Sequence, residues 1–224
     1  MENVIKKILR WLTYEEIIVV CLSLILLGFS YGPLVWQYLN PPPGKVFLGS
    51  FGFPVDFFGN VLTFQEGRLG HWQYTSKISS TIHDKPTFIR AEYLLLGQFS
   101  RLFPLDPIIF FHLVRFFLSI VFILVSYLFI SRIFATKSLR LTAFLLAFFS
   151  TTLDPSRHSL TDRWSPLAIF QRSAYYPHYL LSSIFIILTL IFLHRVLTQK
   201  KLPPLLGAIL FGFLAAQIHP PAIL

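Results

Sequence analysis

Four ionisable side chains stand inside long apolar stretches of the sequence, where such groups are costly and therefore mark candidate functional positions. They are His112, Arg115, His178 and His219. Because His112 and Arg115 are three residues apart, they would share one face of a helix. A guanidinium suits the bidentate recognition of phosphate. Outside these stretches, Asp56 heads a short helical pattern and offers a carboxylate for proton transfer.

Each of these residues also has a purely structural role open to it. Arg115 could extend to the lipid headgroups. His178 follows two tyrosines and a proline, and could belong to a belt of aromatic residues at the membrane surface. His219 precedes two prolines and could mark the end of a helix, and Asp56 could be no more than a helix cap.

The composition is that of a membrane protein. Of the 224 residues, 54% are hydrophobic and 13% are charged, whereas soluble domains carry roughly a quarter charged residues. This excludes an ordinary cytosolic enzyme, and the 17% aromatic content excludes a disordered chain. The net charge is +9, but the basic residues form no long tract, so we expect no nucleic-acid partner.

The usual motifs of nucleotide and metal chemistry are missing from the sequence. It has no P-loop, no HExxH, no CxxC and no GxSxG elbow. Its single cysteine, Cys21, can form neither an intrachain disulfide nor a cysteine-based metal site. The sequence therefore predicts no set of metal ligands, although it leaves a divalent metal open as a cofactor.

Five apolar segments are expected to cross a membrane as helices, for which roughly 20 residues are needed. The chain is thus predicted to be a single all-α, polytopic membrane domain. The third segment is the weakest, because only 13 residues, Leu141–Leu153, are uncharged. The basic residues before the first segment also fit a signal peptide, but the apolar run continues past a cleavage site, so we expect a retained anchor. The expected spans are about 17–39, 106–134, 139–153, 175–197 and 202–223.

The charges between these segments predict their orientation. Residues 6–10, 132–140 and 195–201 carry Lys and Arg, and the last two stretches contain no acidic residue. On the other side of the membrane, Asp and Glu are interspersed with the basic residues. By the positive-inside rule we expect a cytoplasmic N-terminus, a large outer loop at 40–105, and a multi-pass protein of the plasma membrane.

The outer loop at 40–105 is too long for a plain connection and should contain structure of its own. A first helical pattern begins at Asp56, and its apolar residues 57, 58, 61 and 62 fall on one face. A second begins at Pro86 and suits a helix lying on the membrane surface. Its apolar stripe comprises Phe88, Leu95, Phe99 and Leu102. The loop therefore predicts two interfacial helices.

A long first outer loop with two interfacial helices, and an Asp at the start of the first, resembles the GT-C superfamily of membrane glycosyltransferases. Four short runs resemble bacterial GT-C-like membrane proteins more closely, over about residues 1–200. Members of the superfamily commonly have more spans, and some carry a second acidic residue where this chain has Phe57. The runs are Asp56-Phe57-Phe58, Gly70-His71-Trp72, Glu92-Tyr93-Leu94-Leu95-Leu96-Gly97 and His112-Leu113-Val114-Arg115.

This resemblance implies that the protein transfers a sugar from a polyprenyl-phosphate carrier to an acceptor at the outer membrane face. Asp56 would be the catalytic base, and arginine side chains would stabilise the leaving phosphate. Membrane lipid and the lipid-linked donor are the expected partners. The expected substrate-binding residues are Arg115, Arg172, His178, His112 and His219.

A non-enzymatic membrane protein is the competing interpretation: a piece of a transporter, a lipid-binding scaffold or an assembly factor. A transporter usually shows repeated halves or helices broken near the midplane, and the sequence shows neither. The chain also stops at Leu224 directly after an apolar run. An inactive fragment of a larger enzyme is therefore a third interpretation.

Overall fold

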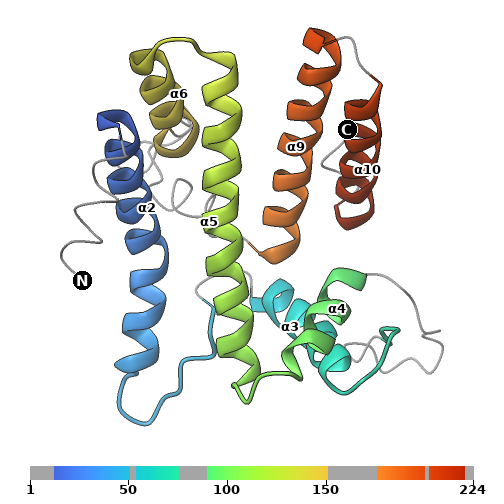
Figure 1. Ribbon diagram of the computed structural model, residues 1–224. Coiled ribbons are helices and arrows are strands. Elements are labelled where there is room, and N and C mark those ends of the chain that lie inside the picture. The colour runs from blue at the N-terminus through green and yellow to red at the C-terminus, as the bar shows by residue number, and fades with distance from the viewer. Residues whose placement is uncertain (1–12, 51–53, 76–89, 151–175, 200–201, 220–224) are drawn as a thin grey trace, which may run out of the picture.

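The computed structural model describes residues 13–50, 54–75, 90–150, 176–199 and 202–219. Within these ranges the protein forms seven α-helices and no strand, which confirms the all-α fold (Figure 1). The helices are α2 (Tyr14–Leu39), α3 (Pro54–Arg68), α4 (Ala91–Ser100), α5 (Pro107–Ile133), α6 (Lys137–Phe149), α9 (Pro177–Gln199) and α10 (Pro203–Ile218).

Three helices have the length and composition of membrane spans. They are α2, α5 and α9, with 26, 27 and 23 residues and mean hydropathies of 2.3, 2.6 and 2.3. The helices at the other two expected spans, α6 and α10, have 13 and 16 residues, fewer than the roughly 20 that cross a bilayer. Three of the five expected spans are thus present as helices of spanning length.

Helix α2 runs antiparallel to α5, whereas α5 and α9 run in the same direction. At one end of the bundle, Tyr31 near the end of α2 shares a hydrogen bond of 2.7 Å with Ser119 of α5. At the other end, Tyr127 of α5 donates to Glu15 at the start of α2. Helices α5 and α9 both begin beside α3 and α4 (Figure 1). We call this end of the bundle, where α3 and α4 lie, the loop end.

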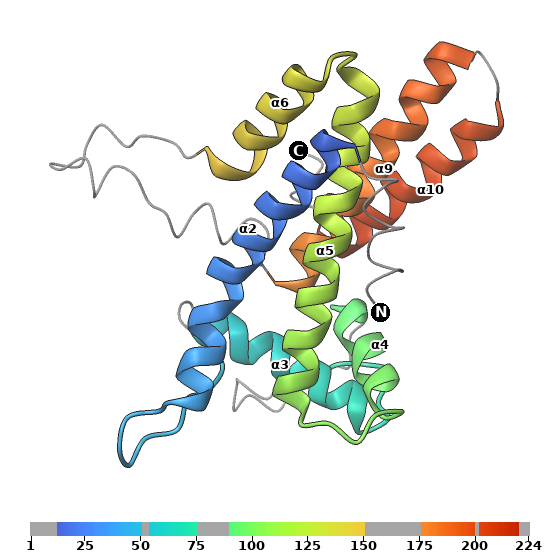
Figure 2. The same cartoon turned by 60° about the vertical axis from the view of Figure 1, so that its left-hand side comes forward.

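Because α5 and α9 begin at the same end, the chain between them must return along the bundle. Helix α6 makes part of this return beside α5, as Figure 2 shows. Phe144 of α6 contacts Tyr127, and Phe148 contacts Phe122, which is closer to the loop end. The predicted third span was 139–153, whereas α6 ends at Phe149 and residues 151–153 lie outside the described ranges.

Two helix starts follow from local capping. The side chain of Thr13 accepts from the backbone of Glu16, whose carboxylate accepts from the backbone of Thr13. This capping box starts α2 at Tyr14, three residues before the expected Ile17. Asp106 accepts from two backbone N–H groups at 2.8 and 3.2 Å and so starts α5, close to the expected boundary.

A buried carboxylate joins three helices at the end opposite the loop end. Glu15 is only 3% exposed. Its Oε1 accepts a hydrogen bond of 2.7 Å from Tyr127 and lies 2.9 Å from Nε of Arg140 in α6. A carboxylate is tolerated at such a depth because both a hydrogen bond and a charge compensate it. This network holds α6 against α2 and α5.

Two glycines let α3 and α4 cross in backbone contact. A Cβ on Gly67 would overlap the carbonyl of Leu94, and one on Gly97 would overlap the carbonyl of Phe64. This crossing, rather than the apolar spacing alone, decides which side of α3 is buried. The expected face was 57, 58, 61 and 62, but the deepest burial falls on Phe57, Asn60, Thr63 and Phe64.

The second loop helix is shorter than expected. It begins at Ala91, because Arg90 adopts a left-handed conformation with φ 62° that a continuous α-helix does not allow. A single helix running on from Pro86 is therefore wrong, and residues 86–89 lie outside the described ranges. Leu95, Phe99 and Leu102 of the expected apolar stripe are exposed, as a membrane-facing surface requires.

Candidate functional site

Arg115 lies near the start of α5, at the loop end, among aromatic rings. Its guanidinium carbon is 5.9 Å from the ring centroid of Tyr31 and 6.0 Å from that of Tyr176. Both distances fall within the range of cation–π attraction. The charge is thus held between α2 and the residue that precedes α9. Ser119, one turn further along α5, bonds both to Tyr31 and to the carbonyl of Arg115, which ties this arrangement to the backbone.

His112 and Arg115 do share one face of α5, as their spacing predicts. An N–H of Arg115 donates to Nδ1 of His112 at 3.0 Å. The imidazole is stacked on Phe57 of α3, with ring centroids 5.7 Å apart. Its Nε2 is buried and has no hydrogen-bond partner among the described residues. It lies against Gly49, whose φ of 87° keeps this position free of a side chain.

His178 stands in the first turn of α9 and bonds to α4. Its Nδ1 is 2.6 Å from the hydroxyl of Tyr93, which is completely buried. Burial raises the pKa of the Tyr93 phenol well above its usual range, so this hydroxyl stays protonated. The His178 ring is also parallel to that of Tyr176, at 6.0 Å. The hydrogen bond therefore connects α4 to α9.

His219, at the end of α10, lies beside His178. It follows the last residue of that helix, and its ring centroid is 5.6 Å from that of His178. Tyr179 contacts both imidazoles, at 4.1 Å from His178 and 4.5 Å from His219. The antiparallel packing of α9 and α10 brings these three rings together.

The contacts around Arg115 and His178 form a closed circuit that joins α4, α5 and α9. Phe111 completes it, because its ring is stacked on Tyr93 at 5.9 Å and lies 5.8 Å from His112. Each member touches the next through a hydrogen bond, a ring contact or a cation–π contact. We call it the Arg115–His178 circuit, and its members are Arg115, His112, Phe111, Tyr93, His178 and Tyr176.

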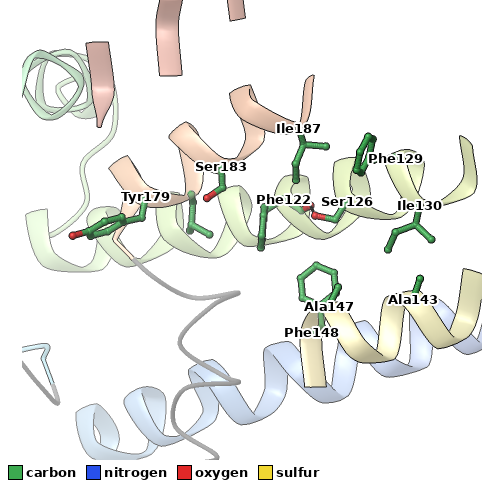
Figure 3. Close-up of a pocket in the computed structure, with 11 residues that line it drawn as sticks. Phe122, Ser126, Phe129, Ile130, Ala143, Ala147, Phe148, Tyr179, Ser183 and Ile187 are labelled. Atoms are coloured by element: carbon green, nitrogen blue, oxygen red, sulfur yellow. Dashed lines mark hydrogen bonds between the residues drawn. The ribbon is translucent and has the colours of Figure 1, made fainter. Parts of the chain in front are cut away.

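An apolar groove extends from this circuit along the bundle. It has a volume of about 620 Å³ and lies between α5, α6 and α9. Tyr179 lines one end, next to His178 and His219, and Ile130 and Ala143 line the other (Figure 3). Its lining residues are Phe122, Ser126, Phe129, Ile130, Ala143, Ala147, Phe148, Tyr179, Leu180, Ser183 and Ile187. Such a lining suits a hydrocarbon chain with a polar group at the tyrosine end.

Asp56 also lies at the loop end, but apart from the circuit. It is exposed in the first turn of α3, which starts at Pro54, so it is not the N-cap that the sequence suggested. Its carboxylate makes no hydrogen bond or ion pair with a described residue. The neighbouring Phe57 is the ring that stacks on His112. Arg172 lies outside the described ranges.

Sequence reasoning assigned no role in the site to its tyrosines, although Tyr93 was part of a run that carries the family resemblance. Tyr31, Tyr93 and Tyr176 surround the ionisable residues, although they are distant from them in the sequence or were assigned to an aromatic belt. Glu92, the first residue of the same run, was also given no role. Burial raises the pKa of its carboxyl. The signal that could have identified Tyr31, Glu92 and Tyr93 is that they are polar and lie within the apolar runs of α2 and α4.

Comparisons with known proteins do not identify the chain: no family model matches it, and neither the curated proteins nor the solved structures include a match. Among the described residues, no group of three or more His, Cys, Asp or Glu side chains is arranged to hold a metal ion.

Proposed function

We propose that the protein is a membrane glycosyltransferase that moves a sugar from a polyprenyl-phosphate carrier to an acceptor at the outer membrane face. The observation that carries this proposal is the set of contacts that links Arg115, His112, His178 and His219 beside Tyr179, which lines one end of an apolar groove. A cation beside hydrogen-bonding groups suits a phosphate, and the groove suits the hydrocarbon chain attached to it. The resemblance to the GT-C superfamily points to the same substrate class.

In the proposed reaction, Asp56 acts on the acceptor hydroxyl and Arg115 acts on the leaving phosphate. The acceptor hydroxyl attacks the anomeric carbon while the bond from that carbon to the phosphate oxygen breaks. Asp56 takes the hydroxyl proton, and polyprenyl phosphate leaves with the electron pair. Arg115 stabilises the charge that develops on the phosphate, with Arg172 and His178 as further contacts.

A lipid-binding scaffold without catalytic activity is the second candidate. It is favoured by the position of Asp56, which makes no contact with Arg115 among the described residues. In a scaffold, the groove and the cationic site would bind the lipid phosphate without any sugar transfer. A protein that binds the lipid tightly but transfers no sugar would support this alternative.

Both candidate functions require the lipid to bind in the groove, and filling the groove tests this requirement. The Ser183→Phe substitution places a ring in the groove, and Leu190→Phe adds the same ring on an exposed position of α9 as a control. We expect Ser183→Phe to weaken binding of polyprenyl phosphate in nanodiscs about tenfold or more, equivalent to about 1.4 kcal/mol. Transfer of labelled sugar to endogenous acceptors in reconstituted membranes should fall in parallel. Unchanged binding by Ser183→Phe would contradict the groove's role.

We also propose that the protein is a plasma-membrane protein with five crossings and a cytoplasmic N-terminus. Single cysteines at exposed positions test this orientation in a Cys21→Ser background. In intact cells, an impermeant thiol reagent should label Gln73→Cys near α3 and spare Lys137→Cys at the start of α6. The reverse pattern would invert the topology, and labelling of neither site would exclude an outer loop.

A further inference from the structure

The hydrogen bond between Arg115 and His112 determines the proton on that histidine. A guanidinium has five N–H groups and no acceptor, so Nδ1 of His112 must be the accepting atom at 3.0 Å. An imidazole with an accepting Nδ1 is neutral and carries its proton on Nε2. His112 is therefore a group that orients Arg115, and it has no free basic nitrogen with which to accept a proton from a substrate.

The hydrogen bond between Tyr93 and His178 indicates that His178, like His112, carries its proton on Nε2, but the reason is different. Either atom could donate across the 2.6 Å separation. If Nδ1–H were the donor, however, the buried hydroxyl proton of Tyr93 would have no acceptor among the described residues. Unpaired buried polar groups are costly, so the arrangement in which Tyr93 donates is the favoured one. The proton of His178 then resides on Nε2.

Nε2 of His178 is in a position to meet a ligand. The residue is only half-buried, and among the described residues no hydrogen bond uses this nitrogen. Its ring faces Tyr176 on one side, and Tyr176 also contacts Arg115. The adjacent Tyr179 lines the groove. A phosphate at the Tyr179 end of the groove would therefore lie beside this imidazole, and Tyr176 contacts both the imidazole and the guanidinium of Arg115.

We propose that Tyr93 is a positioning residue that holds His178 as a fixed Nε2–H donor to the phosphate of the lipid carrier. The proposal rests on the proposed function for the identity of the ligand. It assigns His178 to phosphate binding and excludes it as the base of the reaction. It also gives α4 of the outer loop a role in orienting a side chain of α9.

The tautomer can be measured without any substrate. In ¹⁵N-histidine-labelled protein in nanodiscs, His178 should show an unprotonated Nδ1 and a protonated Nε2, with its signals assigned by their loss in a His178→Asn variant. Tyr93→Phe keeps the ring stacked on Phe111 but removes the hydroxyl, so it should release His178 into a mixture of tautomers. A protonated Nδ1 in the unmutated protein would overturn the proposal.

Two substitutions of His178 separate its two nitrogens. Asn retains an acceptor near Nδ1 for Tyr93 but no donor at Nε2, whereas Gln retains a donor near Nε2. The probes are decaprenyl phosphate and, as a neutral control, decaprenol. We expect His178→Asn to lose about tenfold or more in affinity for decaprenyl phosphate, and His178→Gln to lose less. Neither variant should change decaprenol binding.

The opposite ranking would overturn the proposal. If His178→Asn binds decaprenyl phosphate like the unmutated protein and His178→Gln does not, the bond to Tyr93 only holds α4 against α9. If the unmutated protein does not distinguish decaprenyl phosphate from decaprenol, the donor role and the proposed function fail together. If His178 carries its proton on Nδ1 but the protein still prefers decaprenyl phosphate to decaprenol, only the donor role of His178 is overturned and the proposed function stands.

Discussion

Sugar transfer is expected to fall about 10²-fold or more when Asp56 is replaced by Asn, while binding of the lipid donor stays unchanged. Asn has the same shape as Asp but cannot accept the proton of the acceptor hydroxyl. The side chain is exposed in the first turn of α3 and makes no hydrogen bond with a described residue, so its replacement removes no structural contact. Labelled sugar transferred from a polyprenyl-phosphate donor in reconstituted membranes is the measurement.

Asp106→Asn is the matched control for this loss of charge. Asp106 is also at the loop end, and its carboxylate caps α5 through two backbone N–H groups. Because Asn caps helices about as well as Asp, this variant should fold and transfer sugar normally. Transfer at the unmutated rate by Asp56→Asn would mean that Asp56 is not the base. An equal loss in both variants would point to a general effect of surface charge.

Replacement of Arg115 by Lys is expected to weaken binding of polyprenyl phosphate about tenfold or more, even though the charge is kept. Lys is a point charge and does not reproduce the bidentate hydrogen bonds of a guanidinium. It would also lose the planar group that lies between Tyr31 and Tyr176 and donates to His112. Binding of decaprenyl phosphate in nanodiscs, compared with decaprenol, is the measurement.

Arg195→Lys provides the control for Arg115→Lys. Arg195 is on α9 near the end opposite the loop end, and its guanidinium lies 5.6 Å from the ring of Phe192. It therefore shares the aromatic contact of Arg115 but not its position at the groove. We expect Arg195→Lys to leave binding unchanged. If both variants bind decaprenyl phosphate like the unmutated protein, Arg115 serves only to hold α5 against α2 and the start of α9.

The spanning helices were predictable because the bilayer imposes a simple rule on the sequence. A long apolar segment in lipid must satisfy its own backbone hydrogen bonds, and the α-helix does this within one segment. Helices α2, α5 and α9 follow from this rule. Capping residues such as Asp106 also act locally and are visible in the sequence. The shorter α6 was harder to predict, because its attachment depends on Arg140 meeting Glu15, a residue distant in the sequence.

The segment at residues 40–105 shows where local patterns fail. The apolar spacing identified part of the buried face of α3, because Phe57, Phe58 and Val61 lie in or against the core. The close crossing at Gly67 and Gly97 accompanies the burial of a further side, which includes Thr63 and Phe64. The start of α4 was placed at Pro86, but the left-handed backbone of Arg90 ends any helix that precedes it. The buried face of α3 depends on contacts between segments, which no single stretch of sequence contains.

The same distinction between local spacing and contacts of distant segments applies to the candidate site. The sequence by itself determined that His112 and Arg115 share a helix face, because a spacing of three residues has that result in any α-helix. Only the tertiary structure decided that His178 meets Tyr93, since these two residues are 85 positions apart in the chain. The direction of a histidine's proton depends on such a partner. Residue types can therefore nominate the members of a site, whereas packing decides what each nitrogen can do.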